Sequence, residues 1–250
     1  MVTHAETPLV VPPGKKTGCL LRGTAFGRVF APMAENVRIL PWEEIRQRID
    51  PALGFRPYLK VTLDQNSAGS CATESTSQGI MGTRVKRGGP HVTLNPWSMY
   101  QSTSGGRDNG SNIDDNLAFA SKYGCLPEAV WPRSKGWRAT PPQSLWEEFG
   151  QHFKVDEVYD IGSIQEVATA LIEQYAVVYG WNGHSCLLTE LLDEDTAEYK
   201  NSWGSDWGDD GYGKIKLRSI NFGYGAWAVR TTTICPPEVI EAIRNYTGAT

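Results

Sequence analysis

Residues 63–75 read LDQNSAGSCATES, a short polar stretch that places one of only five cysteines directly after a turn. Gly69 and Ser70 supply the turn and a helix cap, so a helix is predicted from Cys71 to Val85. Serine, threonine and glycine occupy many of its positions, and their low helix propensity means that tertiary packing must hold it. The stretch therefore predicts a cysteine on the first turn of a helix that depends on the rest of the fold.

The composition is that of a globular protein, since 40% of the 250 residues are hydrophobic and 21% are charged, which is enough to bury a sizeable core. The formal net charge of −4 gives no basis for nucleic acid or an anionic membrane as a partner, because both require basic patches. No stretch approaches the ~20 apolar residues of a membrane span, and the N-terminus lacks the apolar core of a secretory signal. A monomer in the cytoplasm is expected.

The cysteines are odd in number and irregularly spaced, without a C-x-x-C pair. They predict neither a disulfide framework nor a zinc site, and no metal or cofactor is expected. At least one thiol must be free unless it pairs between chains. The cysteines interpreted as structural are Cys19, Cys125, Cys186 and Cys235.

Hydrophobic periodicity predicts different structure in the two parts of the chain. Residues 1–35 are rich in proline, glycine and threonine and predict an extended arm, whereas residues 42–50 predict a short helix. Asp114 is predicted to cap another helix that Gly124 ends, and residues 163–166 form a capping-box pattern before a third.

The last part of the chain is rich in β-forming residues. Its short apolar runs, separated by glycine, asparagine and aspartate, are YAVVYGW, HSCLLTELL, AEYKNSW, YGKIKL and AWAVRTTTI. The prediction is an α+β protein of two lobes with a cleft between them. The expected division is an N-terminal extension over 1–56, a mainly helical lobe over 57–145 and a mainly β lobe over 146–250.

Four residues form a candidate catalytic set. A cysteine at a helix N-terminus has its thiol pKa lowered by the helix dipole, which favours the nucleophilic thiolate, although Cys71 alone also fits a small buried hydrophobe. A thiolate catalyst requires an imidazole and a group that orients it. His184 and Asn201 satisfy this requirement if two adjacent strands bring them together, and Gln65 can supply an oxyanion donor with the Cys71 backbone N–H.

Three blocks, in chain order, resemble the papain-like cysteine peptidases. They are DQNSAGSC, GHSCLLTE and KNSWGSDWGDDGYGKIKL, of which the third is the most specific, and NGSNIDDNLAFASKYGCLPEAVWP is a weaker fourth. The resemblance covers about residues 57–230 and implies a papain-like fold, with an antiparallel, barrel-like β lobe and the active-site cleft between the lobes. It implies Cys71 as nucleophile, His184 as general acid and base, Asn201 as its orienter and Gln65 as oxyanion donor.

The resemblance also implies residues around the substrate. Trp203 would shield the hydrogen bond between His184 and Asn201, and Trp207 would line the leaving-group side of the cleft. Val229 would form the base of the main specificity pocket and favour an apolar side chain two residues before the cut. The other positions expected to line the cleft are Gly69, Ser70, Gly110 and Gly183.

The chain departs from the family pattern beside the nucleophile. The usual C-G-[SA]-C-[WY] reads Ala-Gly-Ser-Cys-Ala here, so a disulfide cysteine and an aromatic residue are both missing. Glu74 would face a region that is apolar in the family and therefore requires a partner or water. The stretch before His184 is short, which predicts an open leaving-group side. Whether residues 1–35 cover the cleft or brace the fold stays open, and the compact form suggests a phage or microbial origin.

The expected function is a thiol-dependent endopeptidase that acts on polypeptides through a Cys71 acyl-enzyme. One alternative is a phage-type peptidase that cuts peptidoglycan cross-links, which an open leaving-group side would admit. The other is a catalytically silent papain-like module used for binding or as a virion component. The presence of all four candidate residues favours an enzyme over that last alternative.

Overall fold

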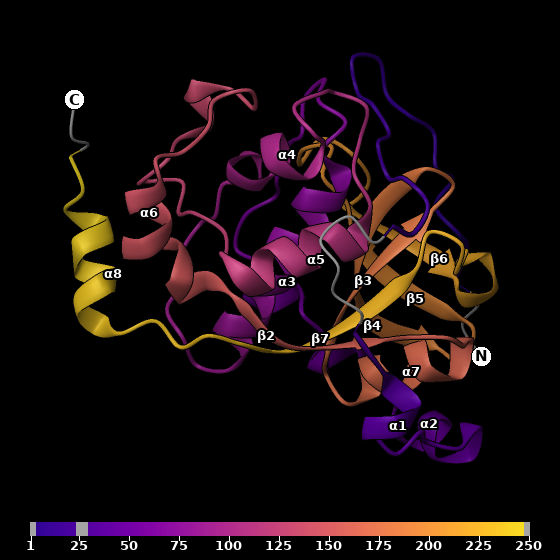
Figure 1. Ribbon diagram of the computed structural model, residues 1–250. Helices are drawn as coiled ribbons and strands as arrows, with labels where there is room; N and C mark the ends of the chain where they lie inside the picture. The colour runs from indigo at the N-terminus through magenta and orange to yellow at the C-terminus, as the bar shows by residue number, and fades with distance from the viewer. Residues whose placement is uncertain (1–3, 24–29, 248–250) are drawn as a thin grey trace.

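The computed structural model describes residues 4–23 and 30–247. Figure 1 shows most of the helices gathered on one side of the molecule and the sheet on the other, with the C-terminal helix at the far end of the helical side. The helices are α1 (Met33–Asn36), α2 (Trp42–Arg48), α3 (Cys71–Lys86), α4 (Trp97–Thr103), α5 (Ile113–Lys122), α6 (Gln143–Glu148), α7 (Ile164–Ile172) and α8 (Pro237–Arg244). None of these helices, which lie within the described ranges, has both the length and the apolar character of a membrane span.

Seven strands within the described residues form one sheet in the order β1-β2-β7-β3-β4-β5-β6. Neighbours pair antiparallel, apart from the parallel pair β1 and β2. The strands are β1 (Ala31–Pro32), β2 (Val155–Asp160), β3 (Ala176–Trp181), β4 (His184–Asp193), β5 (Thr196–Lys200), β6 (Tyr212–Lys216) and β7 (Ala226–Thr232). The five β-rich runs predicted near the C-terminus correspond to β3 to β7, and the predicted α+β class is confirmed.

Helix α3 crosses one face of the sheet and is buried along almost its whole length, from Cys71 to Arg84. Two glycines let its neighbours approach closely. A Cβ at Gly79 would lie 3.4 Å from the Val178 side chain, and one at Gly82 would lie 3.0 Å from the ring of Phe55. Packing therefore compensates for the low helix propensity of this segment, as the sequence required.

The two faces of the sheet carry separate apolar cores because neighbouring residues of a strand point to opposite faces. On β3, Val178 belongs to the core beneath α3, whereas Val177 belongs to the core on the opposite face. Helices α7 and α2 pack together, and α7 also packs on β3 and β4. The sheet therefore packs against α3 on one face and against α7 on the opposite face.

The local predictions had mixed outcomes. The helix expected at residues 42–50 is α2, and the capping box before α7 forms, with Ser163 Oγ accepting from Glu166 N at 3.2 Å. The prediction that Asp114 caps its helix was wrong. The N-cap of α5 is Asn112, and Asp114 lies in the first turn, where its carboxylate accepts a hydrogen bond from Gly23 N at 2.9 Å.

Glu74, in the first turn of α3, is fully buried and does have partners. Its carboxylate lies 2.5 Å from the Arg133 guanidinium and accepts a hydrogen bond from Ser70 Oγ at 3.1 Å. Arg133 also donates to the carbonyl of Asp64 at 2.5 Å, and Trp97 Nε1 donates to Ser70 Oγ at 3.0 Å. This network connects the start of α3 to the preceding turn, beside the positions Ala68 and Ala72, where the pattern that the sequence resembles has a cysteine and an aromatic residue.

Replacing Arg133 by methionine is expected to lower the free energy of unfolding by about 3–5 kcal/mol, because it leaves the Glu74 carboxylate buried without a cation. Burial already raises the pKa of Glu74 against the opposing effect of Arg133. Without Arg133 that pKa rises further, so stability falls as pH increases above the unfolded-state pKa and the deficit is larger at pH 8 than at pH 5. Urea unfolding of the variant and the unmodified chain at both pH values measures the difference in the free energy of unfolding.

The matched control is Arg138→Met. Arg138 lies over the ring of Trp137 at 4.3 Å on a partly exposed segment, and removing its charge is expected to change stability by no more than about 0.5 kcal/mol. A loss of similar size and pH dependence in both variants would show that the effect is not specific to the buried carboxylate.

Candidate active site

Cys71 is the first residue of α3, directly after the N-cap residue Ser70. The preceding turn has Asn66 in the left-handed region, at φ 51°, a conformation that asparagine tolerates better than most residues. Its start is held by Gln65 N, which donates to the Ser202 carbonyl at 2.9 Å. The Cys71 side chain, with none of its surface exposed, therefore lies at the N-terminal end of the buried helix.

His184 and Asn201 are brought together by strand pairing. His184 begins β4, and Asn201 follows β5, whose last residue Lys200 pairs with Leu187. His184 Nε2 lies 2.7 Å from Asn201 Oδ1. Because the amide oxygen only accepts, the imidazole nitrogen that faces it carries the proton. His184 Nδ1 has no hydrogen-bond partner among the described residues, so it stays free to exchange a proton.

Trp203 covers the imidazole. The rings of Trp203 and His184 stack with centroids 4.4 Å apart, and Trp207 packs edge-on against Trp203 at 5.7 Å. Asn201 Oδ1 also accepts from Ser202 N at 2.7 Å. These contacts fix the orientation of the imidazole and of the amide, and they keep water from the hydrogen bond between them, which is the position expected for Trp203.

Gln65 lies beside the helix start with its amide fully engaged. Its Oε1 accepts from Ser202 Oγ at 2.8 Å, and its Nε2 donates to the carbonyls of Ala68 at 2.7 Å and Lys16 at 3.1 Å. Since Ser202 follows Asn201 in the chain, the same segment that orients His184 also orients Gln65. Of these two carbonyls, that of Ala68 belongs to the same turn as Gln65, and that of Lys16 belongs to the N-terminal arm.

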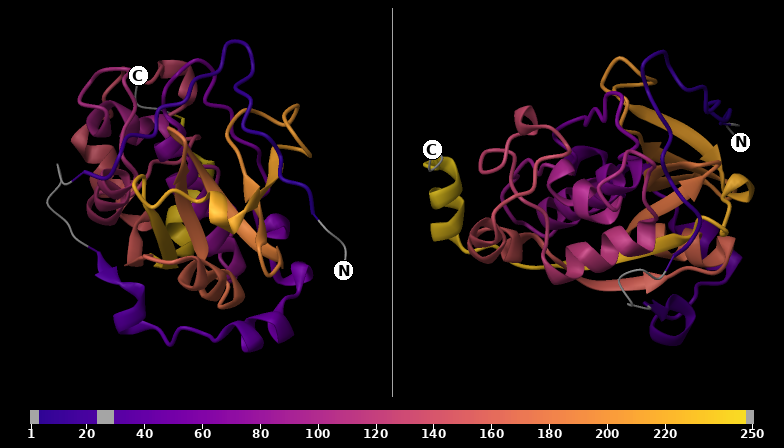
Figure 2. Two further views of the ribbon diagram at one scale, coloured as in Figure 1. Left: turned by 90° about the vertical axis from the view of Figure 1, so that its right-hand side faces the viewer. Right: turned by 45° about the horizontal axis from the view of Figure 1, so that its top comes forward.

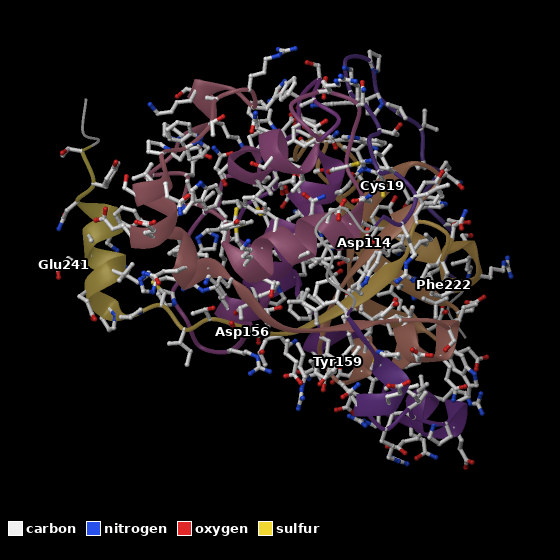
Figure 3. All side chains as sticks on the ribbon, in the orientation of Figure 1. Cys19, Asp114, Asp156, Tyr159, Phe222 and Glu241 are labelled. Atoms are coloured by element: carbon white, nitrogen blue, oxygen red, sulfur yellow. The ribbon has the colours of Figure 1, made fainter. Side chains whose placement is uncertain are left out.

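The arm covers the nucleophile. Two backbone N–H groups of the arm donate to the carbonyl oxygen of Gly183, the residue directly before His184. They are Gly18 N, at 3.0 Å, and Cys19 N, at 2.8 Å. Cys19 also forms a parallel bridge with Ser111. Figure 2 shows the indigo arm crossing from the β strands to the helices, and Figure 3 marks Cys19 on this crossing. The sequence left open whether the arm covers the cleft or braces the fold. The arm covers the cleft, because its residues 15–20 lie over Cys71, which has no exposed surface.

The crossing is tight because it is made between glycines. A Cβ at Gly18 would lie 2.1 Å from the carbonyl oxygen of Gly69, and a Cβ at Gly110 would lie 2.1 Å from the carbonyl oxygen of Gly18. Gly110 also has a φ of +89°, which favours glycine. Gly69, Gly110 and Gly183, expected to bind substrate backbone, therefore all contact the arm.

Two lysines anchor the arm on either side of the Gln65 turn. Lys15 Nζ lies 2.5 Å from Asp64, and Lys16 Nζ lies 2.6 Å from Asp108. Further back, Thr7 N donates to the Lys214 carbonyl of β6 at 2.7 Å. The arm is thus held by charge at the site and by backbone hydrogen bonds on the sheet.

Burial keeps the candidate pair neutral, which corrects the expectation that the helix start lowers the thiol pKa. Desolvation raises the pKa of Cys71 to about 12, outweighing hydrogen bonds from the backbone N–H groups of Ser185, Gly18 and Ala72. Desolvation also lowers the pKa of His184 to about 4, against the hydrogen bond to Asn201. Removing water disfavours both charged forms, so the covered site holds a thiol and a neutral imidazole.

Two expected cleft residues lie elsewhere. Val229 is fully buried and packs near Gly79, eight residues along α3 from Cys71, so it belongs to the core and not to a specificity pocket. Eight residues span about 12 Å along a helix, which rises 1.5 Å per residue. The Ser70 side chain is also fully buried and belongs to the Glu74 network.

The structure adds site residues that the sequence did not indicate. Asp108, on the loop between α4 and α5, accepts hydrogen bonds from Gly69 N at 2.7 Å and Tyr100 Oη at 2.9 Å, besides binding the arm. Ser111 donates its N–H to the Gly18 carbonyl at 2.9 Å. Their loop carries mainly glycine, serine and asparagine, whose pattern predicts flexibility but no pairing, so no sequence signal pointed to either residue.

Comparison with known proteins relates this arrangement to one group of enzymes. No family model matches the sequence. An uncharacterised peptidase C1-like protein of Acanthamoeba polyphaga mimivirus is 21% identical over 218 residues, covering 68% of this chain and 70% of its own length.

Solved structures give a stronger match in shape. Xylellain, a cysteine protease from Xylella fastidiosa, has a TM-score of 0.66 at 18% identity and covers 91% of this chain and 100% of its own. Digestive procathepsin L 3 of Tenebrio molitor has a TM-score of 0.58 at 17% identity, covering 84% and 77%. The cysteine protease CMS1MS2 of Carica candamarcensis, solved in complex with E-64, has a TM-score of 0.53 at 16% identity, covering 79% and 98%.

Proposed function

We propose that this chain, which has the fold of the papain-like cysteine proteases, is a cysteine endopeptidase that cleaves polypeptides through an acyl-enzyme on Cys71. The observation that carries the proposal is the hydrogen bond of 2.7 Å between His184 and Asn201, formed beneath Trp203. It fixes the imidazole with its second nitrogen unpaired, as a general acid and base requires.

The proposed reaction uses each group once the arm has left. The Cys71 sulfur attacks the peptide carbonyl carbon while His184 holds the thiol proton and then delivers it to the leaving amine. Gln65 Nε2 and the Cys71 backbone N–H stabilise the oxyanion, each contributing about 3 kcal/mol to the transition state. Water activated by His184 then hydrolyses the thioester. Trp207, beside Trp203, would line the side of the leaving group.

The arm supports the same assignment of subsites. Its Lys16 carbonyl accepts a hydrogen bond from Gln65 at 3.1 Å, and its amides at Gly18 and Cys19 donate to Gly183. A substrate backbone would use these same donors and acceptors after displacing the arm. The covered state is therefore a latent form, and substrate access requires movement of residues 15–20.

The remaining expectations stay proposals. They are a cytoplasmic location, a monomer and a division of the chain at residues 57 and 146. The peptidoglycan alternative has no specific observation in its favour, and clearing of purified cell walls would distinguish it from protein digestion. A silent module is disfavoured by the ordered hydrogen bond between His184 and Asn201, since binding alone requires no oriented imidazole.

Labelling by E-64 tests the proposal directly. In Gly18→Val, whose arm cannot occupy its place beside Gly69, one E-64 adduct is expected and peptide mapping should find it on Cys71. Folded Gly18→Val should react much faster than the same variant unfolded in urea, because epoxide opening uses the His184 proton. Adducts spread over the cysteines, or no adduct although iodoacetamide reaches Cys71, would contradict the proposal. Intact mass before and after unfolding gives the result.

A further inference from the structure

Asp108 is held by hydrogen bonds at the turn that precedes the nucleophile. One carboxylate oxygen, Oδ1, accepts from Gly69 N at 2.7 Å and from the Tyr100 hydroxyl at 2.9 Å. Gly69 lies two residues before Cys71, so the carboxylate is attached to the same turn that delivers the sulfur. Its side chain retains 18% of its surface exposed even with the arm in place.

The other oxygen of Asp108 faces the arm. Within the described residues, Oδ2 accepts a hydrogen bond from Lys16 Nζ at 2.6 Å. The carbonyl of this same lysine accepts from Gln65 Nε2 at 3.1 Å. One residue of the arm thus places its carbonyl on the oxyanion donor and its ammonium group on Asp108.

The arm also passes the Cys71 thiol, since the backbone N–H of Gly18, two residues after Lys16, is one of three that act on the thiol, with those of Ser185 and Ala72. Lys16 shows how a substrate's basic side chain would be held.

The carboxylate of Asp108 stays charged near neutral pH. Burial raises its pKa, but hydrogen bonds from Lys16, Gly69 N and Tyr100 outweigh that effect and hold the pKa below its usual value. When the arm leaves, this partly buried anion loses its cation beside the point of attack. A lysine or arginine side chain on a substrate would replace it with the same charge-assisted hydrogen bond.

We propose that Asp108 selects substrates in which the attacked carbonyl belongs to a lysine or arginine, so that the enzyme cuts polypeptides after basic residues. The inference rests on the proposed peptidase function and adds its substrate class. Hydrogen bonds to charged groups give about a 10- to 100-fold preference in kcat/KM over an uncharged side chain of similar length.

The second lysine of the arm provides an internal comparison. Lys15 pairs with Asp64 at 2.5 Å, but the Asp64 side chain is 39% exposed, and it is the Lys16 carbonyl that Gln65 binds. The Lys16–Asp108 pair is also partly exposed, since the Lys16 side chain is 49% exposed, so the two pairs differ in which residue's carbonyl lies on Gln65 and not in their screening by water. Asp64 therefore serves as the matched control for Asp108.

The experiment uses full-length Gly18→Val and fluorogenic peptide amides that differ only in the residue before the cut, which is lysine, arginine or norleucine. Lysine and arginine are expected to exceed norleucine by about 10- to 100-fold in kcat/KM. Asp108→Asn, added to Gly18→Val, keeps the acceptor for Gly69 N and Tyr100 and should reduce the preference to about threefold or less. Asp64→Asn in the same background should leave the preference as it was.

The outcomes separate the two proposals. An E-64 adduct on Cys71 and hydrolysis without a basic preference would overturn the role of Asp108 and leave the peptidase proposal standing. A preference that survives Asp108→Asn would overturn it as well. Absence of both the adduct and hydrolysis would overturn the peptidase proposal and this inference with it. If Asp108→Asn does not fold, cleavage positions in a denatured protein mixture decide, because Gly18→Val alone should cut there after lysine and arginine.

Discussion

Alkylation of Cys71 by iodoacetamide at pH 7.5 is expected to be about 100-fold faster in Gly18→Val than in the unmodified chain. The valine Cβ would lie 2.1 Å from the Gly69 carbonyl oxygen, so the arm must leave and water reaches the sulfur. The thiol pKa then falls from about 12 to its ordinary value near 8.5, which raises the thiolate fraction by about 3.5 powers of ten. The lower nucleophilicity of a less basic thiolate offsets about 1.5 of these powers.

The pH profile gives the sign of the effect. In the unmodified chain the rate should still rise about tenfold per pH unit between pH 7 and 10, because the pKa of Cys71 lies above this range. In Gly18→Val the rise should end at a lower pH. Gly162→Ala is the control, since Gly162 lies outside the arm, has no positive φ, and a Cβ there would meet only the end of the Glu166 side chain, at 3.8 Å. Equal rates in Gly18→Val and the unmodified chain would mean that the arm does not limit access to Cys71.

Cys71→Ala, introduced into Gly18→Val, is expected to lower the hydrolysis of peptide amides by at least about 10⁴-fold. Alanine cannot form the thioester, and the groups that remain, Gln65 and the bound imidazole, supply only oxyanion stabilisation and positioning. The fold should persist, because the change removes one sulfur atom from a buried site. Initial rates and circular dichroism of the two proteins measure both effects.

A second buried cysteine provides the matched control. Cys235 lies in the segment before α8 and packs in the apolar core. Cys235→Ala, in the same Gly18→Val background, removes the same atom and should keep hydrolysis within about twofold. Residual hydrolysis above one part in a hundred in Cys71→Ala would place the nucleophile at another residue.

Much of the candidate site follows from local sequence. The turn before Cys71 predicted the start of α3, which begins at Cys71, because turn and cap residues act on neighbouring backbone groups. Short runs rich in β-forming residues identified β4 and β5, and their antiparallel pairing brings His184 and Asn201 together, at 2.7 Å. Local chemistry and strand pairing thus determined the α+β class and the positions of the residues proposed to react.

The tertiary structure decided what surrounds those residues. The pKa of Cys71 was expected to be low from the helix dipole, but desolvation under the arm raises it to about 12, because burial depends on residues far apart in the chain. Contacts of Lys16 with Gln65 and Asp108 likewise join segments 49 and 92 residues apart, which no periodicity relates. Sequence therefore identified the residues proposed to react, whereas long-range packing determined their protonation, their burial under the arm and the carboxylate that binds Lys16.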